Sequence, residues 1–125
     1  MRGNKVYIVY LRKVVEAIIV NKVPTGIPGL DLILRGGFPQ GGVILVAGNP
    51  GAGKTILAAK FIYEGAKRWN EPGVYLSFAE SRRDFFNYMK ELNMDFKELE
   101  EKGLFKFIDL PTVVNEEAII QVIKI

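Results

Sequence analysis

The segment Gly48-Asn-Pro-Gly-Ala-Gly-Lys-Thr55 has the residue types and the spacing of a phosphate-binding loop. It matches the pattern G-x-x-x-x-G-K-[ST] at every position. Its glycines permit backbone angles that other residues avoid, so the chain can approach a phosphate closely. The successive amides of residues 51–55 can point toward one anion, and a helix that starts at Lys54 adds the positive end of its dipole. The loop therefore predicts nucleotide binding through the phosphates.

Two side chains of this loop have roles of their own. Lys54 would neutralise the β- and γ-phosphates, and Thr55 would place its hydroxyl on Mg²⁺. The rest of the loop would cradle the phosphates through its backbone, at Gly48, Asn49, Pro50, Gly51, Ala52 and Gly53. A glycine loop without function is the alternative, and the apolar strand before it and the helix after it argue against that alternative. The pattern alone does not choose ATP over GTP, and it does not show hydrolysis.

The composition limits the remaining chemistry. The chain has no cysteine and no histidine among its 125 residues, which excludes disulfides, thiolate metal sites and histidine-based acid–base catalysis. A metal could bind through oxygen ligands only, and this favours Mg²⁺. A content of 49% hydrophobic and 25% charged residues is that of an ordinary globular domain.

Two carboxylates follow predicted strands and could take part in phosphate chemistry. Glu80 comes after the second strand, where it could orient the water that attacks the γ-phosphate, although a solvated loop glutamate is the simpler interpretation of its position. Asp109 ends a short apolar run as a Walker-B aspartate does, but Lys106 interrupts that run. Arg82 and Arg83 could contact phosphate, and exposed positions in the first turn of a helix suit them better.

Aromatic side chains near these groups are interpreted as packing residues. Phe85, Phe86 and Tyr88 could stack on a base, but with Met89 they also form an ordinary helix-packing stripe, which we prefer. Trp69 is expected to close the core at the end of the helix that follows the loop.

Strands and helices alternate along the chain and must position these groups. We expect strands over 43–47, 74–79 and 104–110 and helices over 29–34, 54–69 and 81–92. A short helix should begin near Asp95 and end by Gly103, and Asn115 could cap a last helix over 116–124. The continuous apolar run Val43–Ala47 predicts a strand buried on both faces. The sequence therefore predicts a three-layer α/β fold with a mainly parallel sheet.

The first 22 residues differ from the rest of the chain. They are apolar and basic, with a net charge of +4 against a total of +3, so that residues 23–125 carry −1. Val6–Leu11 resembles a strand, whereas Val14–Val20 fits a helix or a strand equally. A body without excess positive charge makes nucleic-acid binding an unfavoured expectation. No run reaches the ~20 apolar residues of a membrane span, and no cleavage site follows the N-terminus, so we expect a cytoplasmic protein.

Three segments together resemble KaiC-like ATPases of the RecA/RadA superfamily, which are abundant in archaea. They are Val23-Pro-Thr-Gly-Ile-Pro-Gly-Leu-Asp31, Gly36-Gly-Phe-Pro-Gln-Gly41 and the loop at 48–55, and the resemblance extends from about Val23 to Ile125. It implies a RecA-like P-loop core over residues 23–125, preceded by an extension over 1–22. It further implies ATP with Mg²⁺ as ligand, and assembly into rings or filaments with nucleotide at subunit interfaces.

The sequence departs from this family pattern in three ways. The family usually has two glutamates after the second strand, and here the pair is Ala79-Glu80, which leaves Glu80 as the remaining catalytic candidate. The resemblance places Asp109 on the strand before the Walker-B strand, so that the core is truncated before that strand. Residues 1–22 have no counterpart, and Val6–Leu11 could supply a replacement strand.

These observations lead to a primary function and to alternatives. We expect a KaiC-like domain that binds Mg-ATP and hydrolyses it weakly or not at all, and that associates with itself or with paralogues. A non-catalytic, nucleotide-dependent interaction or oligomerisation module is the main alternative. A DNA-binding recombinase fragment is disfavoured by the charge of residues 23–125.

Overall fold

Helices and strands alternate along most of the chain in the computed structural model, which describes residues 6–9, 21–110 and 117. The elements are β1 (Val6–Val9), β2 (Lys22–Val23), α1 (Pro28–Ile33), β3 (Phe38–Pro39), β4 (Val43–Val46), α2 (Lys54–Trp69), β5 (Gly73–Ser77), α3 (Arg82–Glu91), α4 (Phe96–Glu101) and β6 (Phe105–Asp109). The predicted helix over 116–124, its cap at Asn115 and the segment Val14–Val20 lie outside the described residues, except for Glu117.

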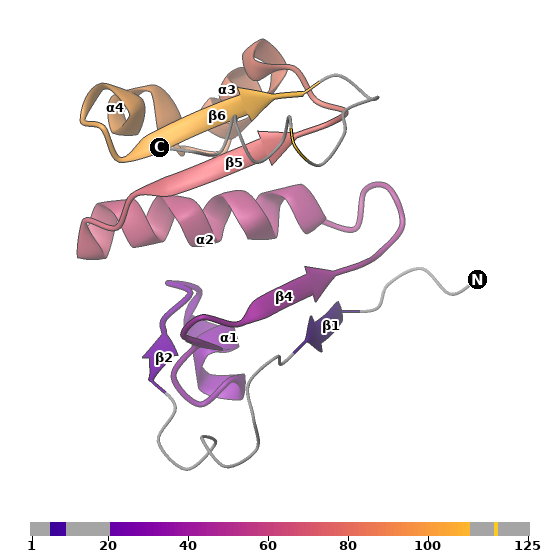
Figure 1. The fold of residues 1–125 in the computed structure, drawn as a ribbon, viewed down its shortest axis with the longest axis vertical. Helices are drawn as coiled ribbons and strands as arrows, with labels where there is room; N and C mark the ends of the chain where they lie inside the picture. Colours follow the sequence, from indigo (N-terminus) through magenta and orange to yellow (C-terminus); the bar gives the residue numbers. More distant parts are fainter. Residues whose placement is uncertain (1–5, 10–20, 111–116, 118–125) are drawn as a thin grey trace.

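The strands pair in three separate ladders. β5 and β6 are parallel, with Gly73 opposite Phe105 and Ser77 opposite Asp109. β4 pairs with β1 in antiparallel fashion, and so does β2 with β3. Figure 1 shows β4, β5 and β6 pointing toward the same end of the molecule, where α2 begins. The expected parallel sheet is thus realised between β5 and β6, while the segment expected to supply a replacement strand does pair with β4.

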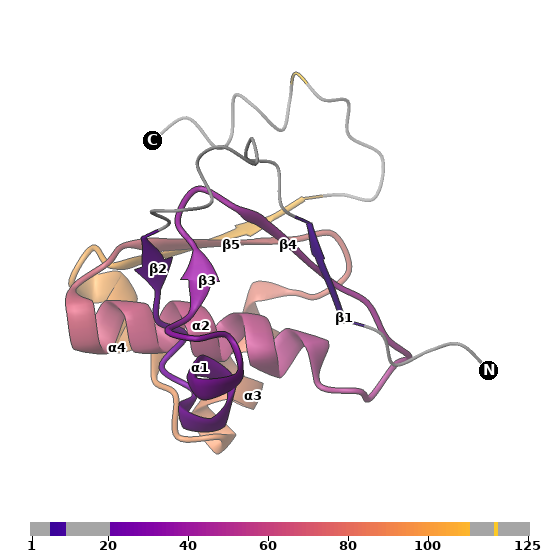
Figure 2. The same cartoon turned by 90° about the horizontal axis from the view of Figure 1, so that it is seen from below.

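One layer of helices covers the strands. Figure 2 shows α2, α3 and α4 on the same side of β5 and β6, so the described residues form two layers rather than the expected three. The prediction that β4 is buried on both faces is wrong for this reason. Ile44 and Val46 face α2, whereas Val43 and Leu45 are 52% and 51% exposed on the opposite face.

An apolar cavity of about 430 Å³ separates β4 from β5. Ile44 and Val46 of β4 line one wall, Val74 of β5 lines another, and Leu57 and Phe61 of α2 contribute as well. The two strands belong to separate ladders, and Figure 2 shows α2 on one side of both rather than between them. Within the described part of the chain, the sheet is therefore interrupted at this place.

The core is built largely from aromatic rings between β5, β6 and the helices α3 and α4. Phe85 of α3 lies at its centre with no exposed surface, and its ring centroid is 5.1 Å from that of Phe96 and 5.1 Å from that of Phe107. Phe85 and Met89 are thus packing residues, as expected. Trp69 is not part of this core, because its side chain is 41% exposed at the end of α2.

The helix ends follow the capping residues that the sequence indicates. The Ser81 hydroxyl accepts a hydrogen bond from the Asp84 amide at 3.1 Å and caps α3. The Asp95 carboxylate accepts hydrogen bonds from the amides of Lys97 and Glu98 and caps α4. The predicted bounds of α2 are confirmed at both ends, with Asn70 in the left-handed conformation as its C-cap.

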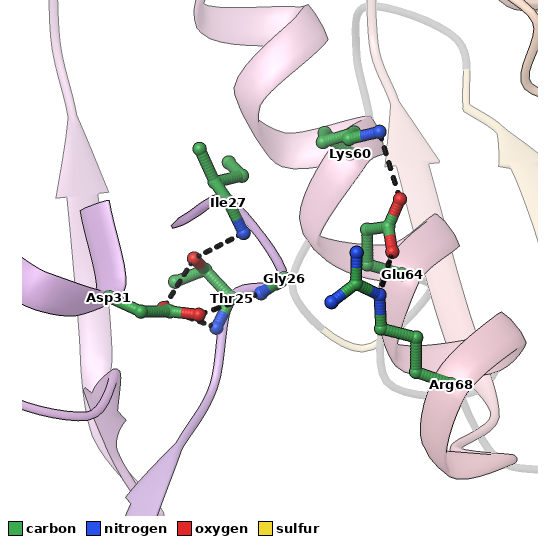
Figure 3. Close-up of polar contacts among 7 residues, drawn as sticks. All are labelled: Thr25, Gly26, Ile27, Asp31, Lys60, Glu64 and Arg68. Carbon is green, nitrogen blue, oxygen red and sulfur yellow. Dashed lines mark hydrogen bonds and ion pairs between the residues drawn. The ribbon is translucent and has the colours of Figure 1, made fainter. Parts of the chain in front are cut away.

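The connector before α1 is fixed by Asp31 (Figure 3). Its carboxylate accepts hydrogen bonds from the amide and hydroxyl of Thr25, at 2.7 and 2.6 Å, and from the Gly26 amide at 3.1 Å. Gly26 adopts a positive φ of 76°, and a Cβ atom there would overlap with the Cβ of Glu64 on α2. The connector therefore approaches α2 more closely than a side chain would permit.

Glu64 is the buried carboxylate at this contact. It is paired on its own helix with Lys60, at 2.8 Å, and with Arg68 one turn further on. Burial raises the pKa of Glu64, but the two cations outweigh that effect and the pKa lies below its ordinary value. The buried charge is thus compensated within α2.

The connector carboxylate makes the stability of the fold sensitive to acid. Burial raises the pKa of Asp31, but the hydrogen bonds from Thr25 and Gly26 outweigh burial and leave the pKa lowered. A carboxyl group whose pKa is lower in the folded than in the unfolded protein stabilises the fold at pH values above its unfolded pKa. This contribution is lost as the pH falls through its folded pKa. We expect Asp31→Asn to cost about 1–3 kcal/mol at pH 7. The difference should shrink below about pH 4, near the ordinary pKa of aspartate.

Urea unfolding at several pH values measures this effect. Glu101→Gln is the matched control, because it neutralises an exposed carboxylate at the end of α4. An Asp31→Asn protein as stable as the wild type at pH 7 would contradict the assigned role of Asp31.

Candidate functional site

The predicted phosphate-binding loop and the loop after β5 enclose one cavity of about 490 Å³. It is lined by Pro50, Gly51, Ala52, Gly53, Lys54, Thr55, Ile56, Ala79, Glu80, Asp84 and Tyr88. The cavity lies where α2 begins and β5 ends, at the carboxyl end of the strands. Glu80 and the phosphate-binding loop, which the sequence could only place on separate elements, thus share a cavity.

The loop glycines are required by backbone angle. Gly51 and Gly53 have φ values of 83° and 97°, which side chains rarely adopt, yet nothing lies within 4 Å of a Cβ built at either residue. A side chain at either position would therefore strain the backbone, and it would also occupy the open space beside the loop. That space is available to a bound group that approaches the backbone closely.

Lys54 is turned back onto its own loop. Its ammonium group donates hydrogen bonds to the carbonyl oxygens of Gly48 and Asn49, the latter at 3.0 Å. Phosphate oxygens bind a cation more strongly than neutral carbonyls do, because the bond is assisted by charge on both partners. Lys54 can therefore exchange these contacts for a phosphate.

The start of α2 has no side-chain cap. Its N-cap residue is Gly53, which has no side chain to accept a hydrogen bond from the helix amides. The side chains of Ser81 and Asp95, in contrast, cap α3 and α4. An anion can satisfy the amides at such a terminus. The amide of Ala52 already donates to the Asn49 carbonyl at 3.1 Å, so that one amide of the expected 51–55 set is engaged within the loop.

Glu80 is held in the cavity by the turn after β5. The buried hydroxyl of Ser77 accepts hydrogen bonds from the amide of Glu80 at 2.8 Å and from that of Ala79 at 3.4 Å. Burial raises the pKa of the Glu80 carboxyl, a hydrogen bond from Tyr75 lowers it, and the charge of Asp84 raises it, with a net upward shift. Glu80 is therefore a partly buried carboxylate that faces the phosphate-binding loop.

Other residues considered in the sequence lie outside this cavity. Asp109 ends β6 with an exposed side chain and is absent from the cavity lining. Arg82 forms a two-pronged ion pair with Glu100, and its guanidinium lies 4.4 Å from the ring centroid of Phe86. Arg83 is exposed in the first turn of α3, as expected.

Sequence reasoning did not identify Asp84 and Tyr88 as cavity residues. Asp84 lies in the first turn of the predicted helix over 81–92, and Tyr88 was interpreted as a member of the packing stripe. The helical period could have identified both residues, since residues 84 and 88 are one turn apart and share a face of the helix. Phe85 and Met89 occupy the neighbouring face and are the ones that are buried. The correction is therefore that the aromatic stripe divides between core and cavity.

The cavity fits a nucleotide with Mg²⁺ better than it fits a bare metal ion. In the described part of the chain, no three acidic, histidine or cysteine side chains gather to hold an ion. Magnesium is commonly bound by few protein oxygens together with substrate phosphates and water. The Thr55 hydroxyl at the start of α2 suits that arrangement.

In the part of the chain that the structure describes, no helix has the length and apolar character needed to cross a membrane.

Comparisons with known proteins agree with this geometry. The family model for the KaiC ATPase matches residues 23–123. A UPF0273 protein of Methanocaldococcus jannaschii is 40% identical over 90 residues, which are 72% of this chain and 37% of that protein. The circadian clock oscillator protein KaiC of Thermosynechococcus vestitus is 39% identical over 90 residues, 72% of this chain and 17% of that protein.

A solved structure is similar in fold. The crystal structure of a KaiC-like protein from Pyrococcus horikoshii matches with a TM-score of 0.72 and 34% identity. The match covers 84% of this chain and 47% of the other. The chain therefore spans less than half the length of these relatives.

Proposed function

The chain belongs to the KaiC ATPase family, and from this premise we propose that it binds Mg-ATP in the cavity beside the phosphate-binding loop. The observation that carries the proposal is the shared lining of that cavity by the loop and by Glu80. A general anion-binding loop would not need a carboxylate opposite the phosphates.

Each group has a distinct role in this proposal. Lys54 binds the β- and γ-phosphates after leaving the carbonyls of Gly48 and Asn49. The backbone from Gly48 to Gly53 and the uncapped start of α2 receive the remaining phosphate oxygens. Thr55 offers its hydroxyl to Mg²⁺, which neutralises phosphate charge when bound. Glu80 orients the attacking water.

We propose that hydrolysis is slow. Ala79 replaces the first glutamate of the family pair, so the cavity lining offers two carboxylates, Glu80 and Asp84. Asp84 sits on the first turn of α3 beside Glu80, and burial together with the charge of Asp84 raises the pKa of the Glu80 carboxyl. Fewer groups are then in place to stabilise the charge that develops during phosphoryl transfer.

A second candidate function is a non-catalytic module that associates in response to nucleotide, with copies of itself or with paralogous chains. Exposed apolar side chains support it, because Leu32 and Ile33 of α1 are 82% and 79% exposed and Val43 and Leu45 of β4 are half exposed. Apolar patches of this kind are typical of interaction surfaces.

Calorimetric titration with ATP in the presence and absence of Mg²⁺ tests the binding proposal. We expect micromolar affinity that depends on Mg²⁺, and the absence of binding to a folded protein would refute the proposal.

Glu80→Gln separates slow hydrolysis from the function of a non-catalytic module. It should leave affinity within about threefold and lower phosphate release roughly 100-fold, at the low end for a group that assists proton transfer. Unchanged phosphate release, with sedimentation that shifts on adding Mg-ATP, would favour the non-catalytic module.

A further inference from the structure

Two carboxylates and one ammonium group line the nucleotide cavity. The carboxylates belong to Glu80 and Asp84, and the ammonium group is that of Lys54. Apart from the phenol of Tyr88, the other side chains of the lining have no ionisable group. The walls of the proposed nucleotide site therefore carry an excess of negative charge, although the proposed ligand is itself an anion.

Asp84 is held at the wall of this cavity by the start of α3. Its amide donates a hydrogen bond to the Ser81 hydroxyl at 3.1 Å, and the amide of Phe85 donates one to the Ser81 carbonyl at 3.0 Å. The Phe85 ring has no exposed surface and anchors this turn of the helix in the core. Tyr88 lies one turn further on and lines the same cavity, so that one face of α3 forms the wall.

The charge of Asp84 is not paired with a cation in the part of the chain that the structure describes. The ion pairs found there join lysine and arginine side chains to other carboxylates, those of Glu64, Glu98 and Glu100. The nearby guanidinium of Arg82 is engaged by Glu100. The carboxylate of Asp84 can therefore act on a charge that enters the cavity.

We propose that Asp84 determines which form of the nucleotide the site accepts, because its charge weakens the binding of ATP that carries no Mg²⁺. The inference rests on the proposed function, in which Glu80 faces the γ-phosphate. Asp84 follows Glu80 by four residues on the same wall, and its charge contributes to the raised pKa of Glu80, as expected for neighbouring carboxylates. Repulsion by Asp84 is largest when no metal ion neutralises the phosphates, and it is smaller for ADP, which lacks the γ-phosphate.

Asp84→Asn tests this inference, because it removes the charge and keeps a side chain of nearly the same size. Glu91→Gln is the matched control, since it removes an exposed carboxylate from the last turn of α3, away from the cavity lining. Affinities are measured by calorimetry for ATP and ADP with a chelator present, and for ATP with Mg²⁺. We expect Asp84→Asn to bind metal-free ATP about three- to tenfold more tightly than the wild type, as a solvent-screened repulsion implies. The affinities for metal-free ADP and for Mg-ATP should change by less than about twofold.

Two further measurements separate the effect of charge from an effect on folding. Asp84→Glu keeps the charge and should bind all three ligands as the wild type does. The gain of Asp84→Asn should also shrink as the salt concentration rises, because salt screens the repulsion.

Two results would overturn the inference while leaving the proposed function intact. One is a wild type that binds Mg-ATP and an Asp84→Asn protein without a gain for metal-free ATP. The other is a loss of Mg-ATP affinity in Asp84→Asn beyond that in Glu91→Gln, because Asp84 would then attract the metal ion rather than repel the phosphates. If the folded wild type binds no nucleotide, the proposed function fails and the inference fails with it.

Discussion

Lys54→Ala is expected to weaken Mg-ATP binding at least about 100-fold. The ammonium group lies in the cavity, hydrogen-bonded to the Gly48 and Asn49 carbonyls, from which it can move to the phosphates. Hydrogen bonds to charged groups contribute about 1.5–3 kcal/mol each, and every 1.4 kcal/mol is tenfold in affinity. Alanine removes the cation and also releases the two carbonyls that the ammonium draws together. Only the loss of the cation weakens binding, because Lys54 gives up the carbonyl contacts when it binds the phosphates.

The effect on binding is measured by calorimetry beside a charge-matched control. Lys90→Ala removes an exposed lysine in the last turn of α3, away from the cavity lining, and should keep wild-type affinity. Circular dichroism establishes that both variants are folded. If Lys54→Ala bound Mg-ATP as tightly as Lys90→Ala does, phosphate recognition would have to lie elsewhere in the molecule.

Phe85→Ala is expected to lower the free energy of unfolding by about 3–5 kcal/mol, the range for deleting a buried phenylalanine ring. Phe85 is fully buried, and five rings surround it, with the closest centroid, that of Tyr75, at 4.5 Å. Their rigid shapes cannot close the space that the ring would leave. Since domains of this size are stable by about 5–15 kcal/mol, the loss is a large share of the total.

Urea unfolding measures this loss. Leu92→Ala, at the end of the same helix, removes a side chain that is 39% exposed and should cost less than about 1.5 kcal/mol. Equal losses in the two variants would show that Phe85 is not the centre of the core. A partly destabilised Phe85→Ala protein should also lose part of its nucleotide affinity, because Phe85 holds α3 beside the cavity.

The contiguous parts of the site could be predicted from sequence, and the parts contributed by distant elements could not. The loop at 48–55 and the bounds of α2 follow from neighbouring residues, because glycine angles and helix capping are local properties. Asp84 and Tyr88 of α3 line the same cavity as this loop and the start of α2. Their placement depends on how those elements pack against one another, and a local sequence pattern carries no information on that packing.

The strands illustrate the same limit. Their existence at β4, β5 and β6 could be predicted, because apolar runs between turn residues favour strands. The partners could not: β4 pairs with β1, and the two-residue strands β2 and β3 have no pattern of their own. An apolar run also indicates that both faces of a strand could be buried, but it does not show which elements would cover them. For this reason Val43 and Leu45 were predicted to be buried, whereas they are half exposed.

The contacts of Thr25, Gly26 and Asp31 bear on how ancestry and activity are to be separated. These residues belong to the segment on which the family resemblance partly rests, yet they cap a connector and fit it against Glu64, and they do not line the cavity. A descendant that had ceased to hydrolyse ATP would still need them to fold. The segment is therefore a mark of shared descent, and whether a given descendant has inherited the activity must be judged at the proposed site residues Lys54, Thr55 and Glu80.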